Sequence, residues 1–163
     1  DYQIVDVRSH DGYVGEKRTT GLNVEPLKLG HIPTAVNINY VDAWADDETK
    51  AIKSYDELRD LYAGLDSSKG VIVYCNSGRR SSFAYYILRL MGFSNVFTYE
   101  ASWKEWGHPD KFLPVETREN KLTGGERPEP SSKTSSISRG AQTRQSGKPS
   151  SGEPAGGYVS CGG

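Results

Sequence analysis

The sequence predicts an α/β fold, with a mostly parallel central sheet flanked by helices. Apolar runs of strand length alternate with segments of helical spacing, the order typical of βαβ units. Residues 71–74 are apolar without alternation, as expected of a central strand covered on both faces. The composition changes sharply near Glu116. We therefore expect one domain over residues 1–115 and a disordered tail over residues 116–163.

The first half of the domain is expected to contribute two strands and a helix. Residues 3–7 are predicted to form the first strand, and residues 35–39 a short second strand entered through a proline. Ser54-Tyr55-Asp56-Glu57 is a capping box, because its serine hydroxyl and its last carboxylate can satisfy free N–H groups at a helix start. Leucines at helical spacing follow, and Gly64 is suited to end this helix.

The second half is expected to contribute the central strand, a longer helix and a last strand. Residues 79–91 are predicted to form the helix, which ends at Gly92. The residues that we expect this helix to bury are Phe83, Tyr86, Ile87, Leu90 and Met91. Residues 96–99 are predicted to form the last strand, followed by a short turn or helix that carries Trp103 and Trp106.

The tail is predicted from its composition. Its 48 residues include 9 Gly, 9 Ser and 4 Pro and very few large apolar side chains. Such a segment cannot bury enough apolar surface to offset the entropy lost on ordering.

Charge and hydropathy narrow the classes of function. The net charge of −1 comes without the basic stripe that nucleic-acid binding requires. No apolar run approaches the roughly 18 residues of a membrane span. The two cysteines, at positions 75 and 161, lack zinc-site spacing, so we expect no metal and no cofactor. The compartment stays open: the need for a free thiol favours the cytoplasm, and a removed signal peptide would indicate the periplasm.

Cys75 is the strongest candidate for a catalytic residue. It follows the central strand and precedes a polar loop, residues 76–81, that leads into the long helix. Helix N-termini stabilise anions through free N–H groups and the helix dipole, and neighbouring guanidinium groups add to this effect. Such settings lower a cysteine pKa from about 8.5 to roughly 3.5–7.5. We therefore predict a nucleophilic thiolate at neutral pH.

Two other interpretations fit part of this pattern. A buried cysteine that ends a strand is often an inert apolar residue, but such a residue needs neither a polar loop nor two arginines. A cysteine-dependent phosphatase would need arginine at the position of Ser81, whereas Arg80 falls one residue early. The loop also lacks the glycine patterns of nucleotide-binding loops. It is therefore better matched to one added sulfur atom than to a phosphoryl group, and the phosphatase stays an alternative.

Three separated motifs resemble the rhodanese family of sulfurtransferases. Residues 74–107 are similar to its active-site loop, the following helix and strand, and a Ser-Trp-x-x-Trp segment. Residues 6–16 contain Asp-Val-Arg-Ser and Tyr-Val-Gly-Glu, and residues 30–37 resemble its Gly-His-Ile-Pro turn. The match covers about residues 2–115. The spacing resembles the C-terminal catalytic half of tandem thiosulfate or 3-mercaptopyruvate sulfurtransferases. This resemblance implies a single rhodanese-like domain and leaves open whether the whole protein has an N-terminal rhodanese-like half as well.

The resemblance implies a two-step transfer of sulfane sulfur through a Cys75 persulfide. A small donor, thiosulfate or as second choice 3-mercaptopyruvate, would supply the sulfur, and cyanide or a thiol would accept it. Backbone N–H groups of the loop would hold the anionic sulfur, with Gly78 permitting the turn. Arg80 is expected to position an anionic donor. The full set of expected substrate-binding residues is Asn76, Ser77, Gly78, Arg79, Arg80, Ser81 and Arg18.

The earlier motifs are expected to support this loop. Asp6 and Arg8 match the structural Asp-x-Arg of the family, and we assign them to holding the loop rather than to chemistry. His31 is expected to be hydrogen-bonded within its turn. A sulfur carrier without catalytic turnover, delivering sulfur to a partner through the tail, is the second alternative. Cys161 is interpreted as a stray tail thiol, with a resolving or sulfur-accepting thiol as the other interpretation.

The choice of donor depends on the stretch before the Gly-His-Ile-Pro turn. Mercaptopyruvate enzymes that this chain resembles carry carboxylate-binding arginines around the Tyr-x-Gly sequence. Here Gly12 occupies one such place, so only Lys17 or Arg18 could substitute. Two arginines in the loop also favour a small dianion. The sequence therefore favours thiosulfate.

Overall fold

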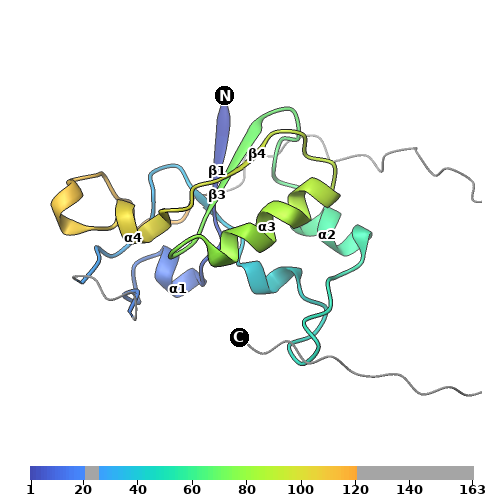
Figure 1. Ribbon diagram of the computed structural model, residues 1–163, viewed down its shortest axis with the longest axis horizontal. Coiled ribbons are helices and arrows are strands. Elements are labelled where there is room, and N and C mark those ends of the chain that lie inside the picture. Colours follow the sequence, from blue (N-terminus) through green and yellow to red (C-terminus); the bar gives the residue numbers. More distant parts are fainter. Residues whose placement is uncertain (21–25, 121–163) are drawn as a thin grey trace, which may run out of the picture. The chain divides into compact units, whose positions relative to one another are not determined.

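The computed structural model describes residues 1–20 and 26–120, so the predicted tail lies outside the described residues from residue 121 onward. The described chain forms a four-stranded sheet with helices, and the predicted α/β class is confirmed (Figure 1). In chain order the elements are β1 (Tyr2–Asp6), α1 (His10–Tyr13), β2 (Val36–Asn37), η1 (Tyr40–Ala43), α2 (Tyr55–Leu61), β3 (Gly70–Tyr74), α3 (Arg79–Leu90), β4 (Val96–Thr98), α4 (Ser102–Trp106) and η2 (Pro109–Lys111).

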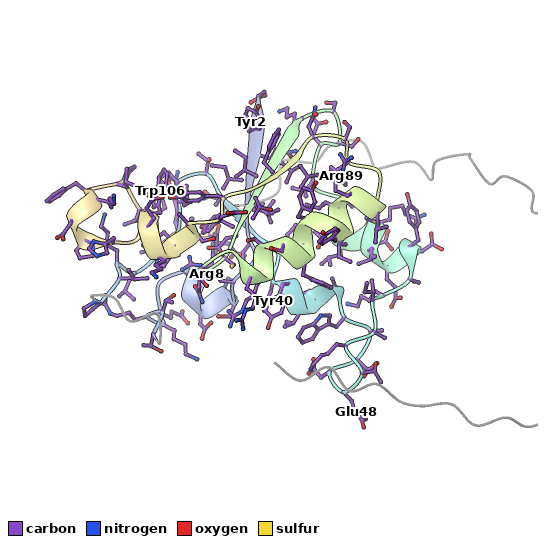
Figure 2. The ribbon with its side chains drawn as sticks, in the orientation of Figure 1. Tyr2, Arg8, Tyr40, Glu48, Arg89 and Trp106 are labelled. Atoms are coloured by element: carbon purple, nitrogen blue, oxygen red, sulfur yellow. The ribbon has the colours of Figure 1, made fainter. Side chains whose placement is uncertain are left out.

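The sheet brings two candidate site residues to one edge. Its strand order is β2-β1-β3-β4, and every neighbouring pair is parallel, with Val5 opposite both Val36 and Val73. Parallel strands have their carboxyl ends at the same edge, where ligands bind in open α/β sheets. Arg8 follows β1 and Cys75 follows β3 at that edge. Figure 2 shows Arg8 at the opposite end of β1 from Tyr2.

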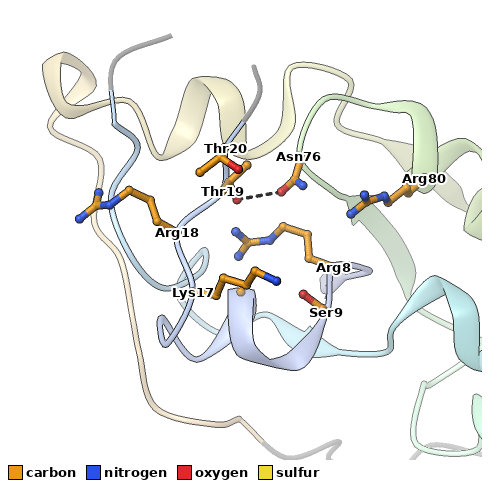
Figure 3. A pocket seen from close by; sticks show the side chains of 9 residues that line it. Arg8, Ser9, Lys17, Arg18, Thr19, Thr20, Asn76 and Arg80 are labelled. Carbon is orange, nitrogen blue, oxygen red and sulfur yellow. Dashed lines mark hydrogen bonds between the residues drawn. The ribbon is translucent and has the colours of Figure 1, made fainter. Parts of the chain in front are cut away.

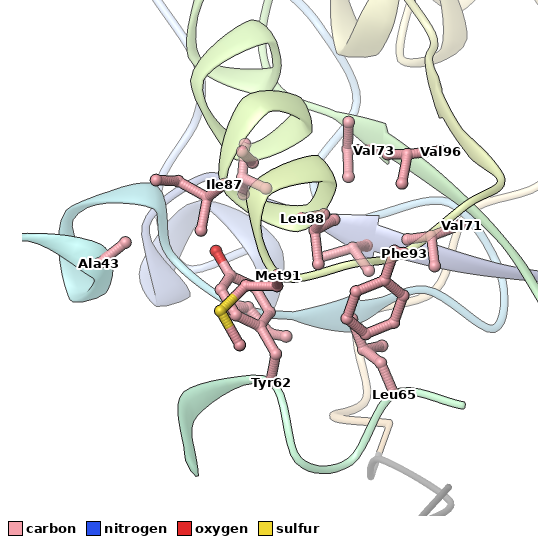
Figure 4. Packing of buried hydrophobic residues seen from close by; sticks show 14 of the residues in the cluster. Ala43, Tyr62, Leu65, Val71, Val73, Ile87, Leu88, Met91, Phe93 and Val96 are labelled. Atoms are coloured by element: carbon pink, nitrogen blue, oxygen red, sulfur yellow. The ribbon is translucent and has the colours of Figure 1, made fainter. Parts of the chain in front are cut away.

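Successive side chains of a strand point to opposite faces of the sheet, so the buried residues form two clusters, one on each face. Val5, Val71 and Val73 face α2 and α3, where they pack with the apolar side chains of those helices (Figure 4). Ile4 and Tyr74 face the other side, where Tyr74 and Trp103 are buried in a second, smaller cluster. The central strand β3 is therefore covered on both faces, as its continuous apolar sequence predicts.

The buried face of α3 differs from the predicted one. Ile87 and Met91 are buried as expected, but Tyr86 is 66% exposed and Leu90 is 73% exposed, so those two predictions are wrong. The stripe that faces the sheet consists of Ser81, Ala84, Ile87, Leu88 and Met91. The small side chains in its first two turns let the helix start close to the sheet. Because the helix starts so close to the sheet, its rotation about its own axis is fixed. That rotation places the stripe of Tyr86 and Leu90 in solvent.

The capping box that begins α2 is confirmed. The Ser54 hydroxyl accepts from the Glu57 N–H, and the Glu57 carboxylate accepts from the Ser54 N–H at 3.0 Å. The helix ends at Leu61, three residues before Gly64, because the chain turns there to bury Tyr62 and Leu65.

Residues 116–120 contact the domain. His31 and Glu116 exchange two backbone hydrogen bonds, at 2.8 and 2.9 Å. The Asn120 N–H donates to the Tyr13 hydroxyl at 2.9 Å. The described chain is therefore anchored beside the Gly-His-Ile-Pro turn up to its last described residue.

Candidate active site

Cys75 lies at the floor of a cavity of about 320 Å³. The residue is only 1% exposed, so its thiol is shielded from bulk water while it borders the cavity. The other described residues that line this cavity are Thr20, Asn76, Ser77, Arg79 and Arg80. Four of the predicted substrate-binding residues are thus placed around the predicted nucleophile. We call this space the Cys75 cavity.

The loop after β3 supplies hydrogen-bond donors to the thiol. Burial alone would raise the pKa of Cys75, but the N–H groups of Ser77, Ser81 and Arg80, with the Ser81 hydroxyl, bring that pKa below its ordinary value. The Ser81 hydroxyl has one hydrogen, which it donates to the Gly78 carbonyl oxygen at 2.7 Å or can turn toward a thiolate. The direction agrees with the predicted thiolate.

The turn of the loop requires glycine at position 78. Gly78 has φ +89°, a left-handed conformation that side chains disfavour, and it directly precedes α3. A Cβ atom there would also lie 3.0 Å from the Glu100 carbonyl oxygen. The predicted role of Gly78 in the turn therefore has two physical causes.

Ser102 holds the loop from below, a role that the sequence did not predict. It is fully buried, and its Oγ accepts from the N–H groups of Cys75 and Gly78, both at 3.2 Å. The same hydroxyl donates to the Tyr99 carbonyl oxygen at 2.7 Å. One side chain thus fixes Cys75, the glycine of the loop and the residue that follows β4. The local sign of this role in the sequence is that Ser102 begins the Ser-Trp-x-x-Trp segment.

Arg80 is oriented by an aromatic ring that the sequence did not single out. Its guanidinium carbon lies 5.2 Å from the centroid of the Tyr40 ring. That distance is within the range of a cation–π interaction. Tyr40 comes from η1, and its ring meets Trp44 edge-on at 5.1 Å. Since Arg80 lines the Cys75 cavity, Tyr40 keeps a positive charge at its wall.

Asp6 and Arg8 form a buried ion pair below the site. The Asp6 carboxylate accepts several hydrogen bonds from Arg8, the shortest at 2.6 Å, and one from the Tyr74 hydroxyl at 2.7 Å. The Arg8 guanidinium also donates to the Gly30 carbonyl oxygen and lies 4.4 Å from the Trp103 ring. The pair therefore connects β1, the residue before Cys75 and α4. This geometry fits the predicted supporting role.

His31 does not line the Cys75 cavity and lies within its turn. Its Nδ1 is 2.8 Å from the Tyr13 carbonyl oxygen, so Nδ1 carries the hydrogen and donates it. Its Nε2 lies 3.2 Å from the Asn120 amide nitrogen and accepts from it. The ring stacks on Tyr13 with centroids 3.8 Å apart. Burial lowers the pKa of His31 below its ordinary value of 6.5, which favours the neutral imidazole.

A second cavity of about 230 Å³ shares Thr20, Asn76 and Arg80 with the Cys75 cavity. We call it the Arg8–Lys17 cavity. Figure 3 shows the polar ends of Arg8, Lys17 and Arg80 directed toward one space, whereas Arg18 extends away from it. The guanidinium of Arg18 donates to the Leu27 carbonyl oxygen. The other described residues that line this cavity are Ser9, Gly12 and Thr19.

The described residues contain no group of three or more His, Cys, Asp or Glu side chains that could hold a metal ion. Within the same residues, no helix is both long and apolar enough to cross a membrane. Cys161 lies outside the described part of the chain.

Comparison with known proteins identifies a family over most of the chain. The sequence profile described as "Rhodanese-like domain" matches residues 1–108. A thiosulfate sulfurtransferase from Corynebacterium glutamicum is 37% identical over 72% of this chain and 39% of its own length. The sulfur carrier protein TtuD of Thermus thermophilus is 41% identical over 64% of this chain and 38% of its own length. The chain therefore spans less than two fifths of each of these curated relatives.

A solved structure agrees with this assignment. One structure of EanB is described as carrying a cysteine persulfide, in a tetrahedral intermediate state with ergothioneine. It superposes on this chain with a TM-score of 0.60 at 31% sequence identity. The superposition covers 71% of this chain and 28% of the EanB chain.

Proposed function

The chain belongs to the rhodanese family, and from this premise we propose that it is a thiosulfate sulfurtransferase that works through a Cys75 persulfide. One observation carries the proposal: a cysteine with a lowered pKa lies at the floor of a cavity and faces the N–H groups of its own loop. The relatives support the same activity, since one is named a thiosulfate sulfurtransferase. EanB, which shares the fold, is described in a persulfide form.

In the first step the Cys75 thiolate attacks the outer sulfur of thiosulfate. A new S–S bond forms, the S–S bond of thiosulfate breaks, and its electron pair leaves with sulfite. The negative charge then lies on the outer sulfur of the persulfide, within reach of the same N–H groups. Arg79 and Arg80 line the cavity that would hold the departing dianion. A thiol with a lowered pKa is more readily ionised before the attack, and an ionised thiol needs no general base.

In the second step cyanide or a thiolate attacks the outer sulfur of the persulfide. The bond between the two sulfur atoms breaks, and its electron pair returns to Cys75 as the thiolate. The product is thiocyanate or a new persulfide. 3-Mercaptopyruvate stays the second choice of donor. This sequence of steps gives ping-pong kinetics.

A sulfur carrier is the second candidate, favoured by the likeness to TtuD. A carrier would accept one sulfur on Cys75 and pass it to a protein partner, with little turnover on small acceptors. Steady-state formation of thiocyanate from thiosulfate and cyanide separates the two candidates, because only an enzyme forms many equivalents per chain. An aryl phosphate in a parallel assay tests the phosphatase alternative.

The proposal is tested by measuring the mass of the intact protein after exposure to thiosulfate. We expect one added sulfur atom on the peptide that contains Cys75, and its loss when cyanide is added. Cys75→Ser should abolish both the added mass and turnover. Cys161→Ser is the matched control and should keep both. Loading that survives Cys75→Ser would contradict the assignment of the nucleophile.

A further inference from the structure

The outer edge of β4 presents backbone groups that the rest of the described chain does not pair. β4 is the last strand in the order β2-β1-β3-β4, and within the described residues it pairs only with β3 (Figure 1). The odd-numbered residues of this stretch face β3, as shown by the Tyr99 N–H, which donates to the Val73 carbonyl oxygen at 2.9 Å. Backbone groups of successive residues point to opposite sides of a strand. Val96 and Thr98 therefore direct their N–H and C=O groups outward.

β4 lacks the features by which edge strands usually avoid pairing with another chain. Such features are a lysine or proline in the strand, or a bulge that twists the edge away. The residues of β4 are valine, phenylalanine and threonine, all of which favour strands. Its register with β3 is uninterrupted from Val96 to Thr98. An open edge of this kind is a template for a further strand.

The face of the sheet beside this edge is apolar and partly exposed. Phe97 is 49% exposed and Tyr2 is 59% exposed, and their rings meet edge-on with centroids 5.8 Å apart. Ile72 lies opposite Phe97 on β3, and Ile4 lies opposite Ile72 on β1. The three side chains border a cavity of about 520 Å³. The apolar surface therefore runs across three strands and reaches the open edge.

A second copy of the same edge satisfies the outward groups of β4. With two β4 strands antiparallel and Phe97 opposite its own copy, Val96 of each chain lies opposite Thr98 of the other. Residues in such positions exchange two hydrogen bonds, so the two pairs make four. The central Phe97 pair is then of the closer, non-hydrogen-bonded type, and both rings lie on one face. The arrangement is self-complementary, as a two-fold dimer requires.

The charges near the ends of β4 fit the antiparallel arrangement. Before the strand, the Arg89 guanidinium donates to the carbonyl oxygens of Phe93 and Ser94. After the strand, Glu100 is exposed. With Phe97 opposite its own copy, Ser94 of one chain lies opposite Glu100 of the other. Opposite charges then come together at both ends, whereas a parallel pairing would bring like charges together.

From the edge geometry and these charges we propose that β4 is the interface of a homodimer, in which one continuous sheet runs through two copies of this chain. The proposal uses the backbone of β4 and the Phe97 side chain, so it does not depend on the chemistry at Cys75. The strand has three residues, and the contact is small compared with the interfaces of permanent dimers. We therefore expect a dimer whose population rises with concentration.

The test measures the association of the full chain by sedimentation equilibrium over the micromolar range, with a reducing agent present. The wild type should dimerise as its concentration rises, and hydrogen exchange of the Val96 and Thr98 amides, followed by NMR, should slow in parallel. Thr98→Pro removes one outward donor from each copy, at a position where an edge strand tolerates proline. It should raise the dissociation constant of the dimer about tenfold or more, because two hydrogen bonds are lost. Thr98→Val keeps the N–H group and should leave that constant unchanged.

Phe97→Lys is a second variant, because it places like charges opposite each other at the centre of the contact. It should weaken the dimer as well. Leu90→Lys is its matched control, since Leu90 is 73% exposed on α3 and does not belong to the edge. Urea unfolding establishes that each variant is folded, and Phe97→Lys decides the matter if Thr98→Pro does not fold.

Three results would overturn the proposal. The first is a monomer at every concentration. The second is slow exchange of the Val96 and Thr98 amides that does not depend on concentration, since a segment of the same chain would then cover the edge. The third is a dimer that forms equally well in Thr98→Pro and Phe97→Lys, because it would use another surface.

Discussion

Replacing Ser102 with alanine removes one hydroxyl that three backbone groups share. The N–H groups of Cys75 and Gly78 lose their acceptor, and the Tyr99 carbonyl oxygen loses its donor. A buried polar group left unpaired costs about 1–3 kcal/mol. The two N–H bonds are long and Gly78 is only partly buried, so water can replace part of the loss. We therefore expect the free energy of unfolding to fall by about 2–4 kcal/mol.

The same substitution should also change the pKa of Cys75. The pKa of Cys75 is lowered by N–H groups whose directions depend on the shape of the loop. A loop without its Ser102 bonds holds those groups less well, so the pKa of Cys75 should move toward that of an ordinary thiol. The assay is the rate of alkylation by iodoacetamide as a function of pH, beside urea unfolding of the same sample.

Two comparisons isolate the hydroxyl. Ser102 has φ +54°, so Ser102→Gly removes the hydroxyl and also relieves about 1 kcal/mol of left-handed strain. It should therefore be less destabilised than Ser102→Ala. Ser82→Ala removes an exposed hydroxyl that donates to the Gly78 carbonyl oxygen, and its stability should change by less than about 0.5 kcal/mol. If Ser102→Ala matched Ser82→Ala in both assays, the reasoning about this residue would be refuted.

Substitutions at three further residues test the electrostatics of the fold and the site. Burial lowers the pKa of His31 below 6.5, so the unfolded chain binds its proton first, and the free energy of unfolding should fall as pH decreases below about 6.5. Urea titrations between about pH 5 and pH 8 should show that the free energy of unfolding of the wild type depends on pH in this way, and that most of this dependence is absent in His31→Asn. Equal pH dependence in the two proteins would mean that another group causes it. Arg80→Ala should raise KM for thiosulfate about tenfold or more, the scale of a lost charged hydrogen bond, and shift the alkylation profile less than Ser102→Ala does. Tyr40→Leu should raise the same KM to a smaller extent and Tyr40→Phe should restore it, whereas equal KM values in both variants would exclude the cation–π role.

Local patterns in the sequence were sufficient for most of the fold. Strand-length apolar runs, the capping box at Ser54 and the glycine before α3 each act over a few residues. Their physical effects do not depend on what the rest of the chain does. The position of Cys75 at a strand end followed from the same local reasoning, because a parallel sheet fixes where its carboxyl ends lie.

The rotation of α3 could not be obtained in this way. Two neighbouring apolar stripes run along this helix, one through Tyr86 and Leu90 and one through Ala84, Ile87 and Leu88. Hydrophobicity favours the stripe with the larger side chains. The observed choice depends on how closely the first turn can approach the sheet, and small residues decide that approach. Helical periodicity gives the spacing of a buried stripe but does not select between two candidates.

Residues that act on the site from distant parts of the chain were missed for a different reason. Ser102 is 27 positions from Cys75, and Tyr40 is 40 positions from Arg80. Serine in a short helix and tyrosine after a strand are ordinary residues in those places. Their roles arise only when the start of α4 lies against the loop and η1 packs against α3. The topology of the chain creates such contacts, and local sequence patterns do not predict them.

The thiolate and the arginines of the loop have separate physical roles. The sequence suggested that the guanidinium groups help to ionise Cys75, but the groups that chiefly lower its pKa are N–H and O–H donors. In the proposed cycle a backbone donor would keep its direction whether the sulfur is a thiolate or a persulfide, so it would stabilise both forms. Arg80 then remains available to anions, since it packs on Tyr40 and lines both cavities without a carboxylate among their described lining residues. If one arginine both ionised the thiol and bound the substrate, each arriving anion would weaken the nucleophile that it needs. Assigning ionisation to the loop backbone and anion binding to the arginines avoids that conflict.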